Sequence, residues 1–119
     1  MRYRSMIPNW RNNARMSHND DVSPSNYRPM PDITSWLQEH LLTDSEFVMA
    51  DGLDEAFVGY VENHSTGPVA VYDTNKVLEL LEKDMDMTRL EAIEFFNFNI
   101  IGSYIGPQTP LFLRRYDTS

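Results

Sequence analysis

The sequence contains no cysteine, which excludes a disulfide, a thiolate nucleophile and a zinc site with sulfur ligands. No apolar run approaches the roughly 18 residues of a membrane-spanning helix. The arginine-containing start also lacks the apolar stretch of a signal peptide. From these absences we expect a cytoplasmic protein that makes no contact with a membrane.

Basic residues are scarce in the middle of the chain. Residues 29–113 carry three basic and fifteen acidic side chains, whereas residues 1–28 carry five arginines and two aspartates. The net charge of −8 therefore belongs to an acidic body with basic ends. Such a body repels nucleic acid and attracts basic surfaces. We expect a protein partner with a basic surface, or self-association, and regard nucleic acid as the least favoured partner.

Residues 1–31 contain four of the seven prolines, many Asn and Ser residues, and no helical or alternating apolar period. A segment of this composition cannot bury enough apolar surface to offset its own ordering entropy. We predict an irregular, basic N-terminal arm that wraps over a folded surface of this chain or of a partner. Trp10, Arg11 and Arg15 are its candidate partner-binding residues.

Residues 32–113 are predicted to form one acidic α+β domain, followed by a short basic tail at residues 114–119. Helical periodicity and capping signals predict a short helix from about Asp32 to Leu41, a second from Thr74 to Lys83 capped by Asp73, and a third from the Thr88–Glu91 capping box to Gly102. Apolar or alternating runs predict strands at Glu46–Ala50, Ala56–Asn63, Pro68–Asp73 and Thr109–Leu113.

The order of these elements predicts an antiparallel sheet of about four strands with two to three helices packed on one face. The first three strands are expected to form a meander. The last strand is expected at an edge, because Pro110 has no amide N–H to donate.

The third predicted helix has more apolar residues than one core-facing stripe can hold. We expect Leu90, Ile93, Phe96 or Asn97, and Ile100 to face the core, and Gly102 to end the helix in a left-handed conformation. The surplus rings of Phe95, Phe98 and Tyr104 are then expected to meet the arm, another subunit or a partner.

Several segments together resemble a known group of proteins: Asp51-Gly52-Leu53-Asp54-Glu55-Ala56, Val69 to Asp73 with Lys76, Glu91-Ala92, and Phe98-Asn99 with Gly102, Tyr104, Gly106, Thr109 and Pro110. This pattern, over about residues 46–113, resembles an uncharacterised group of small acidic proteins of tailed bacteriophages and prophages. The resemblance implies a phage setting in a host cytoplasm and no particular chemistry. The chain departs from the group at Met85 or Met87, where a glycine often follows the acidic residue between the helices.

The candidate catalytic and metal sites all have a simpler structural explanation. Asp84 to Thr88 resembles the start of a calcium loop, but Arg89 replaces the required glycine and Phe95 the final carboxylate. Asp51, Asp54 and Glu55, with Asp73, could converge for acid–base chemistry or bind magnesium, but a turn, a helix cap and solvated acids are the favoured explanation. The three histidines, His18, His40 and His64, are too scattered for a metal set. We predict no catalytic residue, metal or cofactor.

The favoured function is a phage-encoded, non-enzymatic protein-binding module that modulates a host enzyme or defence complex through its acidic surface. Its predicted contact residues in the body are Asp51, Asp54, Glu55, Phe95, Phe98 and Tyr104. The alternatives are an accessory or structural phage subunit, a small carboxylate- and magnesium-dependent enzyme, and nucleic-acid binding through the arm.

Overall fold

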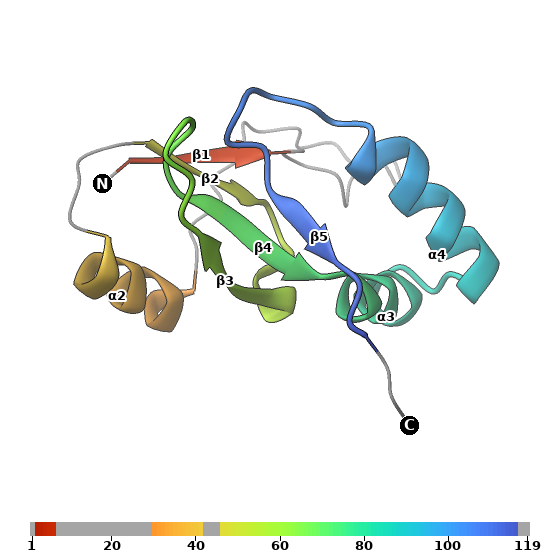
Figure 1. Cartoon of the computed structure of the whole chain (residues 1–119). Helices are drawn as coiled ribbons and strands as arrows, with labels where there is room; N and C mark the ends of the chain where they lie inside the picture. Colours follow the sequence, from red (N-terminus) through yellow and green to blue (C-terminus); the bar gives the residue numbers. More distant parts are fainter. Residues whose placement is uncertain (1, 7–29, 42–45, 117–119) are drawn as a thin grey trace, which may run out of the picture.

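The computed structural model describes residues 2–6, 30–41 and 46–116 and has an α+β fold (Figure 1), as the sequence predicts. The elements are, in chain order, β1 (Arg2–Met6), α2 (Pro31–His40), β2 (Glu46–Ala50), the short 3₁₀ turn η1 (Asp54–Ala56), β3 (Phe57–Val61), β4 (Val69–Asp73), α3 (Thr74–Asp84), α4 (Arg89–Phe95), the π-helical continuation η2 (Phe96–Ile101), and β5 (Leu111–Leu113). Within the described residues, no helix is long and apolar enough to cross a membrane.

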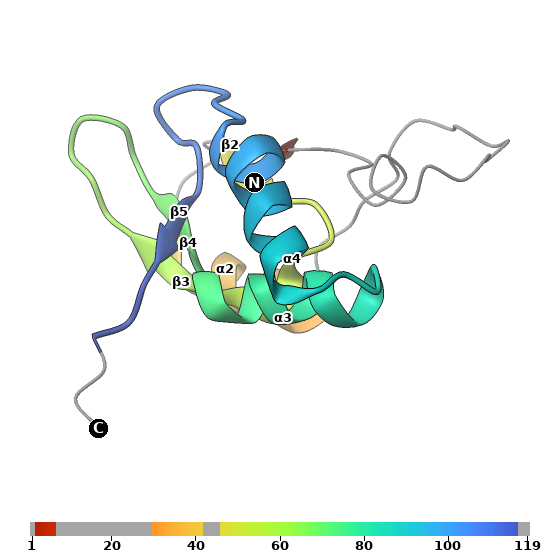
Figure 2. The ribbon, with the colours of Figure 1, turned by 90° about the vertical axis from the view of Figure 1, so that its right-hand side faces the viewer.

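The strands form two groups rather than one antiparallel sheet. Strands β3 and β4 pair as the predicted antiparallel hairpin, and β5 lies at the edge of the order β3-β4-β5, as Pro110 suggests. However, β5 runs parallel to β4, because the chain returns through α3 and α4 before it re-enters the sheet. Figure 2 shows these two helices on one side of the three strands.

The predicted three-stranded meander is wrong, because β2 pairs with β1 and not with β3. The pairing of β1 with β2 is parallel, with Arg2 opposite Glu46 and Met6 opposite Ala50. The expectation of an irregular arm is therefore wrong for residues 2–6, where a distant strand supplies the hydrogen-bonding partner that a local pattern cannot reveal. Trp10, Arg11 and Arg15 lie outside the described residues.

The phenol of Tyr72 connects the two groups of strands by a hydrogen bond. The hydroxyl oxygen of Tyr72 on β4 accepts the backbone N–H of Ala50 on β2 at 2.8 Å, and both residues are fully buried. The Tyr72 ring also packs against Phe57 and Phe112, with ring centroids 5.6 and 5.8 Å apart. The rings of Phe96 in η2 and Phe112 are almost perpendicular, with centroids 5.3 Å apart, so this aromatic series extends from β3 to the third helix.

The prediction for the core-facing side of the third helix is confirmed for Phe96 and Ile100 and wrong for Leu90 and Ile93. Ala92, Phe96 and Ile100 are buried, whereas Leu90 and Ile93 are exposed. The inward side places the Phe96 ring against Phe112 and leaves Leu90 and Ile93 on the outside. The spacing of apolar residues in the sequence cannot show that Phe96 packs against Phe112.

The third helix ends at Ile101, before Gly102 as predicted, but for a different reason. Gly102 has a φ of −75°, which is not left-handed. A Cβ atom at this position would lie 3.2 Å from the carbonyl oxygen of Phe98. Glycine is favoured here because the backbone approaches closely, and not because of its conformational freedom.

Replacing Tyr72 with phenylalanine removes the hydroxyl and leaves the buried Ala50 N–H without its acceptor. We expect Tyr72→Phe to lower the free energy of unfolding by about 1–3 kcal/mol, the cost of an unsatisfied buried polar group. Urea denaturation followed by circular dichroism measures this loss. A variant as stable as the wild type would show that the hydrogen bond does not hold the strand groups together.

The buried Tyr72 hydroxyl also makes the protein less stable at alkaline pH. Burial raises the pKa of Tyr72 above its ordinary value; the Ala50 hydrogen bond opposes this shift, and the charges of Asp54 and Asp51 add to it. The folded state therefore favours the neutral phenol. Because the phenol of the unfolded chain ionises near pH 10, the free energy of unfolding decreases as the pH rises above about 10. In that range, we expect the free energy of unfolding of the wild type to fall by up to about 1.4 kcal/mol more per pH unit than that of Tyr72→Phe. Equal slopes for the two proteins in urea titrations would contradict this.

Candidate functional site

The turn between α3 and α4 has an unusual backbone conformation. Asp86 has a φ of 55°, the only positive φ of a non-glycine residue among the described residues. Aspartate tolerates this left-handed conformation better than most residues do. The capping box then begins α4 as predicted, since the Thr88 hydroxyl accepts the Glu91 N–H at 3.1 Å and Glu91 Oε1 accepts the Thr88 N–H at 2.8 Å.

The turn and the outer side of the third helix border an open, shallow hollow of about 530 Å³, which we call the α4 hollow. Its lining combines two kinds of side chain, the apolar Met85, Met87, Phe95 and Phe98 and the polar Asp86, Glu91, Glu94 and Asn99. The nearby cation Arg89 pairs with Glu82 on α3 at 3.2 Å and does not line the hollow. The α4 hollow is therefore an acidic concavity with an apolar component.

Several apolar side chains of the third helix and of the loop that follows it are exposed. Phe98 is 82% exposed, Leu90 66% and Tyr104 75%, and Ile101 is also exposed. Phe95 is half-buried and packs against the core. The expected exposure is therefore confirmed for Phe98 on the helix and for Tyr104 in the loop after it, and it is wrong for Phe95. Sequence reasoning missed Met85, Met87 and Glu94, although the alternation of Asp and Met before Thr88 was a visible signal.

The acidic residues predicted to contact a partner, Asp51, Asp54 and Glu55, lie elsewhere, and none of them lines the α4 hollow. Asp54 Oδ2 accepts the Met30 N–H at 2.6 Å, which fixes the start of α2, and Glu55 is exposed. The Asp51 N–H donates to the Met6 carbonyl at 3.2 Å.

Asp73 occupies the N-cap position of α3 as predicted, but its side chain makes no capping hydrogen bond. One carboxylate oxygen lies 3.5 Å from Arg115 Nε in the C-terminal segment. In the part of the chain that the structure describes, no three His, Asp or Glu side chains are placed to hold a metal ion.

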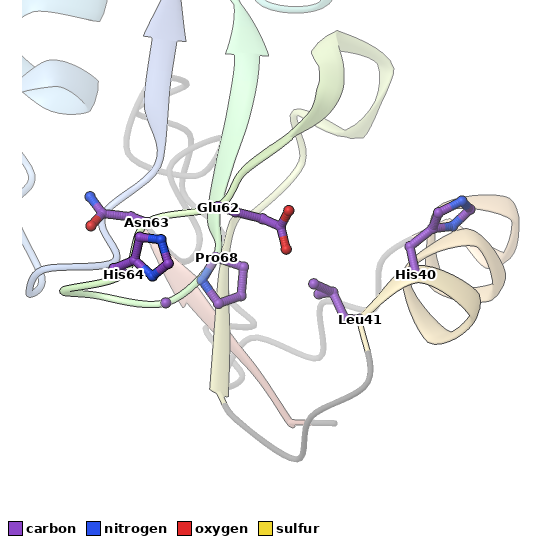
Figure 3. Close-up of a pocket in the computed structure, with 7 residues that line it drawn as sticks. His40, Leu41, Glu62, Asn63, His64 and Pro68 are labelled. Carbon is purple, nitrogen blue, oxygen red and sulfur yellow. The ribbon is translucent and has the colours of Figure 1, made fainter.

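A second concavity lies between α2 and the β3–β4 hairpin, with a volume of about 390 Å³. Figure 3 shows His40 on α2 and His64 on the hairpin loop at opposite ends of it. His40 Nδ1 donates to the Trp36 carbonyl at 2.8 Å, and its ring packs on Trp36 with centroids 4.6 Å apart. His40 therefore packs on its own helix and His64 lies in the hairpin loop, while His18 lies outside the described residues.

Comparisons of the chain with protein-family models, with curated proteins and with solved structures gave no match. The phage resemblance therefore stays a prediction, and the function must be argued from the surface itself.

The left-handed residue of the α3–α4 turn offers a direct test of the hollow's geometry. We expect Asp86→Val to lower the free energy of unfolding by about 1–3 kcal/mol, because a β-branched residue is strained at this φ. Asp86→Gly should cost little, because glycine adopts a positive φ freely. Urea denaturation measures the free energy of unfolding of both variants. An equal decrease in the two would contradict the left-handed conformation of residue 86.

Proposed function

We propose that this chain is a non-enzymatic protein-binding module whose α4 hollow receives a basic surface of its partner. The observation that carries the proposal is the coincidence of exposed apolar side chains with acidic ones at this position. Phe98 in particular is almost fully exposed, although burial of a phenylalanine side chain is worth about 1.5–3 kcal/mol.

The apolar side chains are of the types that dominate protein interfaces. Aromatic residues supply much of the binding energy in interface hot spots. Methionine has a flexible, polarisable side chain that adapts to irregular surfaces. Met85 and Met87 beside Phe98 therefore suit a partner that inserts one or two apolar side chains among its basic residues.

The acidic side chains explain which partner is selected. Asp86, Glu91 and Glu94 surround the apolar groups, and the chain as a whole has a net charge of −8. Such a charge distribution steers the molecule toward basic surfaces and disfavours acidic ones. Basic surfaces commonly serve to bind nucleic acid, so occupation of one would inhibit its owner. Together with the phage resemblance, this favours modulation of a host enzyme or defence complex.

One observation supports a second candidate, an accessory or structural phage subunit. Val58, Val61, Leu111 and Leu113 are exposed on the three-stranded sheet. Val71 pairs with Leu111, and Leu113 points to the same face because side chains alternate along a strand. That face is opposite the one covered by α3 and α4 (Figure 2) and would suit an interface between subunits.

The proposal predicts a partner that depends on two side chains of the α4 hollow. The tagged full chain is used to capture proteins from a nuclease-treated bacterial lysate, in parallel with the double variant Glu94→Gln/Phe98→Ala. For a purified captured protein, we expect Phe98→Ala to weaken binding at least about tenfold and Glu94→Gln about two- to fivefold, measured by calorimetry.

The matched control is Glu62→Gln/Tyr116→Ala, which removes one exposed carboxylate and one exposed ring elsewhere on the surface. It should bind as the wild type does. Capture of no protein even at low salt would contradict the proposal, and so would equal losses in the two double variants. Displacement of bound DNA from the purified partner would separate the modulator from the structural subunit.

A further inference from the structure

A small aromatic pocket lies where the first turns of α2 meet the start of β3. It has a volume of about 190 Å³ and is lined by Asp32, Ile33, Trp36, Phe57 and Val58. Small-molecule sites usually measure about 300–1,000 Å³, so this pocket suits a single side chain and not a whole metabolite. It shares no residue with the α4 hollow.

The spacing of residues on α2 builds one wall of the pocket. Asp32, Trp36 and His40 are separated by four residues each and so lie in one line along the helix. Helical side chains lean toward the helix N-terminus, which brings the Trp36 indole over the turn that carries Asp32 and Ile33. The carboxylate and the indole therefore share the same concavity.

The indole is held in place although it is 39% exposed. Its ring packs against His40, Tyr60 and Phe57, with centroids at 4.6, 5.6 and 6.3 Å. Phe57 is inclined at 75° to it, so the two rings form walls almost at right angles. The bond from the Met30 N–H to Asp54 anchors the helix just before these residues. The pocket is thus preorganised by contacts on α2, η1 and β3.

The charge of the pocket indicates its ligand. Within the described ranges, Asp32 is exposed and takes part in neither an ion pair nor a side-chain hydrogen bond. A carboxylate beside aromatic faces attracts organic cations, through charge pairing and through the negative faces of the rings. Ile33 and Val58 supply apolar surface for the methylene groups that precede such a cation.

We propose that this pocket binds the cationic side chain of a lysine or arginine on a partner protein. A neutral apolar side chain would leave Asp32 unpaired, and an acidic one would be repelled. The inference does not depend on the α4 hollow. A partner that used both sites would gain affinity because the second contact becomes intramolecular.

The test uses single-residue analogues, so that no partner needs to be known. The chain has two tryptophans, Trp10 and Trp36, and Trp10→Phe leaves Trp36 as the only indole reporter. N-acetyl-lysine methylamide and N-acetyl-arginine methylamide are titrated while Trp36 fluorescence is recorded, with ionic strength matched by sodium chloride. We expect saturable changes with dissociation constants on the order of 10 mM, as a single ion pair and cation–π contact allow.

The matched variants are Asp32→Asn and Glu39→Gln, which remove one exposed carboxylate each from the same helix, inside and outside the pocket. Asp32→Asn should weaken binding about two- to fivefold and Glu39→Gln should not. The uncharged norleucine analogue should give no saturation over the same range. Comparable binding of that analogue, or equal weakening in both variants, would overturn the proposal. If Trp10→Phe fails to fold, the indole N–H resonance of Trp36 in the wild type gives the same readout by NMR.

Discussion

The hydrogen bond from the Ala50 N–H to the Tyr72 hydroxyl joins two groups of strands that share no ladder of backbone hydrogen bonds. In a dry interior, an unpaired N–H or hydroxyl costs far more than an exposed one, so this contact restricts how β2 can lie against β4. The Tyr72 ring then positions its neighbours, because Phe57 and Phe112 pack on it from either side. Through Phe96, the same aromatic series determines which side of the third helix faces inward.

That inward side determines the functional surface by simple helix geometry. With Ala92, Phe96 and Ile100 in the core, Leu90 and Phe98 must point outward. On α2, burial of Ile33 and Leu37 likewise leaves Asp32 and Trp36 outside. Both proposed binding sites are thus on the outer sides of helices whose inner sides are fixed by packing. Their apolar components cannot join this core without removing others from it, which leaves them available to a partner.

Local features of the fold were predictable because short-range contacts decide them. The hairpin of β3 and β4, the capping box at Thr88 and the span of α3 all depend on residues within a few positions of each other. The pairing of β1 with β2 and the parallel direction of β5 depend on partners far away in the chain. Within the third helix, burial of Phe96 and Ile100 was predicted correctly, whereas Leu90 and Ile93 were wrongly expected in the core, because local apolar spacing does not show where the rest of the core lies.

The sequence by itself determined the acidic character of the body, the excess of aromatic residues on the third helix and the absence of thiol chemistry. These follow from composition and local period, which folding cannot change. The folded arrangement alone shows that Met85, Met87 and Glu94 line one hollow with Phe98, and that Asp32, Trp36 and Phe57 line one pocket. Such convergence depends on how helices turn and pack against strands, and that arrangement is set by long-range burial, with Tyr72 at its centre.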